Sequence, residues 1–312
     1  MRFLVAVPIA VFVLAFGASY VYYGSEGREA DAKEEAAAPG GPKDRIVVAV
    51  RGDREGESYL WVVSLDGSNP VQITHAPGAD TTAADASPAW SPDGELIAFT
   101  RQVVDATGQP SRPYLYTVAP DGSGLRQLTK GDSFDTVPAW SPEGSRILVG
   151  HMVDETPTDL FVVDRDGSGA ELLVGDRRTH EWLATFSPDG LRIAYTVALD
   201  DEDIWLMNAD GSGKRVLLGG RSPDSSPAWS PDGRTIAFVR ERRIAVMRPD
   251  GSGVHVLGND IRGAHPRWSP DGTRILFTGD PDGIFVMNAD GSGLMEVPIE
   301  GRAAGASWEP AA

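Results

Sequence analysis

The feature that most constrains this chain is a phrase that it repeats. Residues 88–100 read PAWSPDGELIAFT, and close copies follow, each with an aromatic residue, a turn and a short apolar run. Repetition at a fixed period is typical of repeat architectures, in which each unit is one supersecondary structure. The aromatics stand 39 to 50 residues apart, at Trp90, Trp140, Phe186, Trp229, Trp268 and Trp308.

A second phrase, Asp-Gly-Ser, alternates with the first, at Asp66, Asp121, Asp166, Asp210, Asp250 and Asp290. Each repeat therefore predicts four short antiparallel strands joined by Pro- and Gly-containing turns. The chain has 36 Gly and 23 Pro, which fits many turns. Four strands in about 40–45 residues is typical of a β-propeller blade. The Asp-Gly-Ser segments resemble the start of a calcium loop but lack its acidic twelfth residue, so we interpret them as hairpin turns.

The two ends of the chain hold complementary parts of the repeat. The last copy stops at SWEPAA, just after its aromatic, and the first begins at DRIVVAV without the aromatic half. We expect residues 305–310 to pair beside residues 45–51 and complete a shared blade, which leaves no unpaired blade. The predicted fold class is all-β: a six-bladed β-propeller closed by the C-terminal inner strand and preceded by one N-terminal transmembrane or signal helix.

The N-terminal region differs from the rest. Residues 3–23 are uncharged, and a helix of about 20 such residues spans a bilayer. The run predicts a membrane anchor or, if it is cleaved near Gly17–Ser19, a secretory signal. Either interpretation places the remainder outside the cytoplasm, tethered by residues 3–23 or secreted. The expected domains are 1–24, a signal anchor; 25–43, a flexible linker that ends in Pro-Gly-Gly-Pro; and 44–312, the propeller.

The repeated PAWSPDG and DGSG motifs together resemble the TolB-like propeller repeat of bacterial cell-envelope proteins, over about residues 44–312. The resemblance implies a propeller that binds an envelope protein. TolB-type members carry an α/β domain before the propeller, and this chain has only the apolar run and a short linker there. The same repeat builds propellers of peptidases and pectin lyases, so the resemblance transfers a fold and not a chemistry.

Motifs for catalysis are missing from the sequence. It has no Cys, no Gly-x-Ser-x-Gly elbow and no His-Glu-x-x-His motif. We therefore predict no catalytic residue, no metal site and no cofactor. A net charge of −17 disfavours nucleic-acid binding. We expect a monomeric propeller with a protein partner in the envelope. The five histidines are scattered, at His75, His151, His180, His255 and His265.

One acidic pattern suggests a binding site. Four consecutive repeats place a carboxylate five residues before the aromatic, at Asp85, Asp135, Glu181 and Asp224, and Gly263 and Ala303 follow in the last two. In a propeller these positions are expected at the mouth of the central channel, where they would attract a cation or a basic peptide. Contact residues are expected beside them at Trp182, Thr136, Ser225 and His265, with Trp182 exposed.

The alternative is that each carboxylate caps its own loop by accepting bonds from backbone N–H groups. The function that the sequence favours is protein interaction or scaffolding through the acidic mouth. A sensory propeller that binds a small ligand, a sugar or a cation is the alternative, and a lyase- or peptidase-related enzyme is less favoured. The repeated tryptophans are interpreted as core residues between neighbouring blades.

Overall fold

A computed structural model describes residues 44–311, apart from residues 55, 132, 154–155, 200, 259–261 and 280–281. All regular elements in this part of the chain are β-strands. The predicted anchor (residues 1–24) and linker (residues 25–43) lie outside the described residues. Within those residues, no helix has the length and apolar character that crossing a membrane requires.

Four sheets each consist of four consecutive antiparallel strands. The first contains β8 (Ser133–Trp140), β9 (Arg146–Val153), β10 (Asp159–Asp164) and β11 (Glu171–Val174). The second contains β12 (His180–Phe186), β13 (Arg192–Ala198), β14 (Glu202–Asn208) and β15 (Arg215–Leu218). The third contains β16 (Asp224–Trp229), β17 (Ile236–Arg240), β18 (Arg243–Met247) and β19 (His255–Val256). The fourth contains β20 (Gly263–Trp268), β21 (Arg274–Gly279), β22 (Gly283–Asn288) and β23 (Met295–Glu296).

The remaining strands form a single eight-stranded sheet, in which β24, β1, β2, β4, β5, β6 and β7 follow one another and β3 pairs with β2. Their bounds are β1 (Arg45–Arg51), β2 (Ser58–Ser64), β3 (Val71–Gln72), β4 (Thr82–Trp90), β5 (Ile97–Val104), β6 (Tyr114–Val118), β7 (Arg126–Gln127) and β24 (Ala303–Trp308).

The prediction of six separate blades preceded by a helix is therefore wrong. The described residues form four separate four-stranded blades and one larger sheet, and they contain no helix. The larger sheet arises because β4 is nine residues long and reaches back far enough for Ala84 to form a parallel bridge with Ser58 of β2. The Ser58 hydroxyl also donates to the carbonyl of Asp85, at 2.7 Å. Sequence periodicity alone does not show such a bridge between repeats.

The two ends of the chain pair as the sequence suggested. Strand β24 runs antiparallel to β1, with Trp308 opposite Ile46 and Ser307 opposite Val47. The Glu309 N–H donates to the carbonyl of Arg45, at 3.0 Å. The first strand is consequently not a sheet edge, because the last strand covers it.

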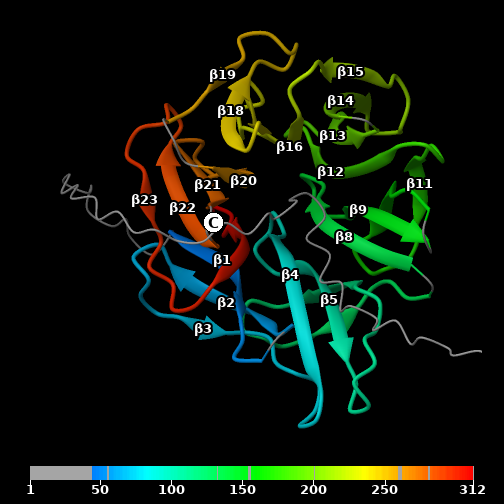
Figure 1. The fold of residues 1–312 in the computed structure, drawn as a ribbon, viewed down its shortest axis with the longest axis vertical. Helices are drawn as coiled ribbons and strands as arrows, with labels where there is room; N and C mark the ends of the chain where they lie inside the picture. Colours follow the sequence, from blue (N-terminus) through cyan, green and yellow to red (C-terminus); the bar gives the residue numbers. More distant parts are fainter. Residues whose placement is uncertain are drawn as a thin grey trace, which may run out of the picture. The chain divides into compact units, whose positions relative to one another are not determined.

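The sheets follow one another around a common axis (Figure 1). The inner strands β4, β8, β12, β16, β20 and β24 each contact the next in this order, and β24 contacts β4. Apolar clusters lie between neighbouring sheets; one joins Ile46 and Val48 of β1 to Leu276 and Val286 of the preceding sheet. Burial of these faces against each other is the main stabilising contribution.

The repeated aromatics occupy these interfaces, as predicted. Trp90, Trp229 and Trp308 are buried, and Trp140 and Trp268 are half-buried against the core. The indole N–H of Trp140 donates to the carbonyl of Ala89 on the preceding inner strand, at 3.0 Å. The indole N–H of Trp268 donates to the carbonyl of Ala228 at 3.0 Å, and that of Trp308 donates to the carbonyl of Arg267 at 3.1 Å.

The Asp-Gly-Ser segments are turns, which confirms that interpretation. In each repeat the aspartate Oδ1 accepts a bond from the backbone N–H two residues later, at 2.9 Å. The following glycine has a positive φ, for example +79° at Gly67, which glycine adopts without steric cost. In each of these six turns the aspartate carboxylate accepts a hydrogen bond from the backbone of its own loop, as in an Asx turn.

Candidate binding site at the start of the inner strands

The four predicted carboxylates all lie near the beginning of inner strands, directly opposite a residue of the next strand. This opposite residue is always 16 positions later in the chain. The cross-strand pairs are Asp85–Arg101, Asp135–His151, Glu181–Val197 and Asp224–Arg240. Three of the four carboxylates therefore face a basic side chain, and Glu181 faces an apolar one.

The aspartates opposite arginines form two-pronged ion pairs. Arg101 Nε and Nη2 donate to the two oxygens of Asp85 at 2.6 and 2.7 Å, and both side chains are almost completely buried. Arg240 binds Asp224 in the same way, at 2.8 and 2.7 Å. Burial raises the pKa of Asp85, and the bonds from Arg101 oppose that rise. Such fork-shaped pairs fix geometry strongly, so these carboxylates are occupied internally.

Asp135 has three internal partners. His151 Nδ1 lies 2.8 Å from its Oδ1, and Oδ2 accepts bonds from the Thr129 hydroxyl and the Leu115 N–H. Thr74 occupies the position of Thr129 in the preceding repeat and donates to Asp85, at 2.5 Å. The threonines lie two residues after the outer strand of one repeat, and the aspartates lie near the beginning of the inner strand of the next. These bonds therefore join consecutive repeats.

Glu181 is the exception. Its Oε1 accepts a bond from the Thr179 hydroxyl at 2.5 Å, whereas its Oε2 is buried and has no hydrogen-bond partner within the described part of the chain. The side chain is 3% exposed. Burial raises the pKa of Glu181 to about 7, and the neighbouring carboxylate of Asp159 adds to the rise. This carboxyl group is therefore half protonated near neutral pH.

The predicted contact residues are only partly accessible. Trp182 is 7% exposed and Ser225 is 8% exposed, so the expectation that Trp182 is exposed is wrong. Thr136 is half-buried and donates weakly to the Gly150 carbonyl, at 3.4 Å. His265 lies on β20 with a φ of +52°. Burial and the nearby Arg267 lower the pKa of His265 to about 4, so it is neutral at physiological pH.

The position just after each carboxylate position forms a second row, which we call the axial row, and solvent reaches four of its six members. Ala86 and Ala304 are exposed, and Thr136 and Ala264 are half-buried. Ala86 and Ala304 lie on β4 and β24, which contact each other, and a Cβ on the adjacent Gly305 would lie 3.7 Å from the Ser87 Cα. Small side chains at this end leave the strands accessible. Trp182 and Ser225 complete the row but are buried.

Among the described residues, no group of three or more His, Asp or Glu side chains is arranged to hold a metal ion. The carboxylates serve internal bonds, but their partners are mostly side chains and not the backbone N–H groups of their own loops that the capping alternative expects. The sequence does carry a signal for these ion pairs, because a basic residue follows each aspartate by 16 positions, at Arg101, His151 and Arg240.

The comparisons with known proteins agree with the repeat. The family described as "TolB beta propeller domain" matches residues 24–181, which is half of the chain. A protein named "Protein TolB homolog" from Chlorobium chlorochromatii (strain CaD3) is 32% identical over 146 residues, which are 47% of this chain and 30% of that protein. The chain thus spans less than a third of the length of that relative.

Among solved structures, TolB from Acinetobacter baumannii has a TM-score of 0.71 at 20% identity, over 88% of this chain and 68% of that one. An oligogalacturonate lyase in complex with manganese has a TM-score of 0.57 at 16% identity, over 83% of this chain and 74% of that one. At these identities the similarity shows the fold alone, and propellers of one fold serve binding proteins and enzymes alike.

Proposed function

The chain belongs to the TolB β-propeller domain family, and on that premise we propose that it is a protein-binding module of the cell envelope, located outside the cytoplasm. The apolar run at residues 3–23 supports a tether to the membrane, with residues 25–43 as a linker. A rigid ring that presents residues from several strands on one face is suited to binding a protein surface.

We centre the binding surface on the axial row, not on the four carboxylates. The observation that carries this choice is the exposure of Ala86 and Ala304 on neighbouring inner strands. Asp85, in contrast, is 1% exposed and already holds Arg101. The buried ion pairs beneath the row keep the strand ends in place, and a preorganised surface loses less entropy on binding.

Substitutions in the axial row test the proposal. The full chain is immobilised and exposed to a membrane and envelope extract of its own cell, and captured proteins are identified by mass spectrometry. Ala86→Arg with Ala304→Arg places two long charged side chains on the surface, so we expect capture of the partner to fall at least about tenfold.

The matched control is Leu191→Arg. Leu191 is 67% exposed and lies in the turn between β12 and β13, at the other end of the inner strands. Capture by this variant should equal that of the unmodified chain. Circular dichroism and thermal unfolding check that all three proteins are folded. Undiminished capture by the folded double variant, or loss of capture in Leu191→Arg alone, would refute the axial row as the binding surface.

A further inference from the structure

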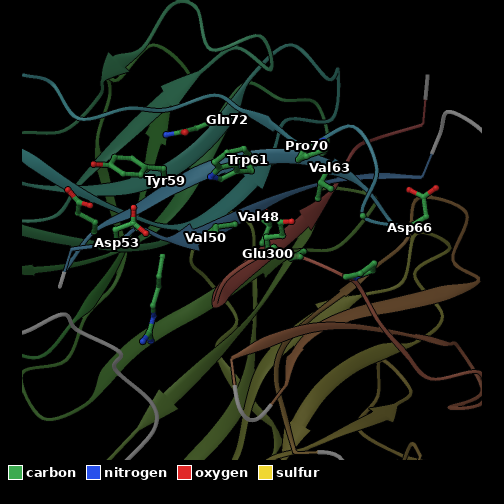
Figure 2. A pocket seen from close by; sticks show the side chains of 16 residues that line it. Val48, Val50, Asp53, Tyr59, Trp61, Val63, Asp66, Pro70, Gln72 and Glu300 are labelled. Atoms are coloured by element: carbon green, nitrogen blue, oxygen red, sulfur yellow. The ribbon is translucent and has the colours of Figure 1, made fainter. Parts of the chain in front are cut away.

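A pocket of about 800 Å³ opens beside the closing strand, and we call it the seam pocket. Its floor is formed by Val48 and Val50 of β1 and by Tyr59 and Trp61 of β2, and the segment 298–300 forms the opposite wall. Figure 2 shows Asp53 and Tyr59 toward one end and Asp66 toward the other, with Trp61, Val48 and Glu300 between them. The pocket is therefore an elongated site with an aromatic and aliphatic floor.

The rim of the seam pocket is acidic. Carboxylates of Asp53, Glu57, Asp66 and Glu300 line it, and Arg51 is the one cationic side chain of the lining. Arg51 lies 3.4 Å from the carboxylate of Asp282, which offsets its charge. Burial raises the pKa of Tyr59, and the negative charge of Glu57 raises it further. The site consequently favours a positively charged group.

The neighbouring repeat shows what such a site holds. Val50 pairs with Ala303 and with Tyr59, just as Arg101 pairs with Asp85 and with Tyr114. Val50 thus stands where the next repeat has Arg101, Ala303 stands where it has Asp85, and Trp61 stands where it has Tyr116. The guanidinium of Arg101 lies 5.8 Å from the ring centre of Tyr116 and 5.4 Å from that of Phe99.

The first repeat lacks this internal guanidinium and its carboxylate, and it has instead a pocket that Val50 and Trp61 line and four rim carboxylates surround. We propose that the seam pocket binds an arginine side chain of a peptide segment from a partner protein. The guanidinium stacks on Trp61, and the exposed rim carboxylates of Asp53 and Glu300 neutralise it, since Glu57 already pairs with Arg54 at 3.9 Å. Val50 and Ile299 contact the aliphatic part of the side chain. This surface is distinct from the axial row.

Arginine fits this chemistry better than lysine. A guanidinium is planar, stacks on aromatic faces and is more weakly hydrated than an ammonium group, so it loses less on entering an aromatic pocket. The rim carboxylates of Asp53 and Glu300 are exposed and can reach a cation without leaving solvent. Ionic attraction at an exposed rim weakens with salt, so the affinity should fall as ionic strength rises.

The test uses the full chain and a defined probe, the peptide acetyl-Gly-Leu-Arg-Leu-Gly-amide, with isothermal titration calorimetry as the readout. A second peptide carries citrulline, the uncharged counterpart of arginine. We expect saturable binding of the arginine peptide and at least about tenfold weaker binding of the citrulline peptide. Equal binding of the two peptides, or no saturable binding of the arginine peptide, would overturn the proposal.

Variants locate the site. Trp61→Ala and Glu300→Gln should each weaken the arginine peptide several-fold. The matched controls are Trp205→Ala, which removes the indole at the same register position on β14, and Glu171→Gln on the exposed start of β11. Both controls should bind as the unmodified chain does. An equal loss in Trp205→Ala and Trp61→Ala would contradict the assignment to the seam pocket.

A gain-of-structure variant gives a second, independent result. Val50→Arg with Ala303→Asp installs in the seam the pair that Arg101 and Asp85 form in the next repeat, and we expect this variant to fold and to lose peptide binding. Persistent binding by that folded variant would count against the proposal. Ala86→Arg with Ala304→Arg should leave peptide binding intact, so a failure of the axial-row proposal and a failure of this one are distinguishable.

Discussion

Glu181 differs from the three aspartates of the inner strands in the residue opposite it. Arg101, His151 and Arg240 face the aspartates, and Val197 faces Glu181. A buried carboxylate without a cation is held more easily in its neutral form, because transfer of the charged form from water is unfavourable. Burial without a base on the opposite strand, together with the nearby carboxylate of Asp159, raises the pKa of Glu181 to about 7.

This raised pKa predicts a pH dependence of stability. The folded state binds the Glu181 proton more tightly than the unfolded chain, whose carboxyl has a pKa of 4.5. The contribution of Glu181 to the free energy of unfolding is therefore fully present below about pH 4.5 and is lost as the pH rises to about 7, by on the order of 3 kcal/mol.

Glu181→Gln should flatten that fall, because the amide resembles the neutral carboxyl and does not titrate. Urea unfolding of both proteins at several pH values between 5 and 8 gives the comparison. The exposed Glu171→Gln serves as the control and should leave the pH dependence unchanged. Parallel curves for the unmodified chain and Glu181→Gln would show that Glu181 does not titrate in this range.

At the residue scale, the sequence predicted where the four carboxylates lie in the repeat better than it predicted the side chains with which they pair. The spacing from the aromatic correctly aligned Asp85, Asp135, Glu181 and Asp224, because the strand register is fixed by the repeat. Position relative to the aromatic does not predict their burial, because burial depends on the residue that each carboxylate faces across the hairpin. The basic residues 16 positions later carry the missing information, since a hairpin of that length brings the two side chains opposite each other.

At the scale of the element, the inner strands share a bulge three residues before the aromatic. The bulge residue has a positive φ in every repeat, at Ser87, Val137, Leu183, Ser226, His265 and Gly305. The strand pairing shifts register there. A bulge leaves a residue out of the ladder, and the position after it is proline at 88, 138, 227 and 266. Proline is tolerated where no ladder bond is lost.

The same position in β12 is Ala184, which lies between the paired residues Trp182 and Thr185. Ala184→Pro should therefore keep the fold and raise the free energy of unfolding by about 0.4–1 kcal/mol, because proline restricts the unfolded chain. Thr185→Pro, one residue later, places proline opposite Ala194 in the ladder and should destabilise by about 3 kcal/mol or more. The free energy of unfolding of both variants is measured by chemical unfolding. Equal destabilisation of the two would contradict the assignment of the bulge.

The strands themselves were predictable from the sequence, and the bulges and the inter-repeat bridge were not. Alternating apolar residues and Pro-Gly turns indicated strands such as β5 and β6 directly. The parallel bridge between Ser58 and Ala84 depends on how far β4 extends at its N-terminal end. That length is set by the path of the loop between repeats, which has no periodic signal.

At the scale of the whole molecule, the closing strand places residues from both ends of the chain next to each other. The pairing of β24 with β1 brings Ala304 beside the strand that carries Ala86, and it also creates the seam where Val50 and Ala303 take the places of Arg101 and Asp85. The complementary ends of the repeat predicted this closure. The seam pocket was not predictable, because it depends on how side chains from both ends of the chain pack where the ring closes.

The central claim is that a partner protein binds at the axial row. The chain contains no cysteine, so a single introduced cysteine can carry a photo-activated crosslinker at a known position. The decisive measurement compares Ala304→Cys and Leu191→Cys, each labelled in the full chain, mixed with the envelope extract and irradiated. The account predicts a covalent adduct with one partner protein from position 304 and none with that protein from position 191. An adduct with that partner only from position 191 would contradict it.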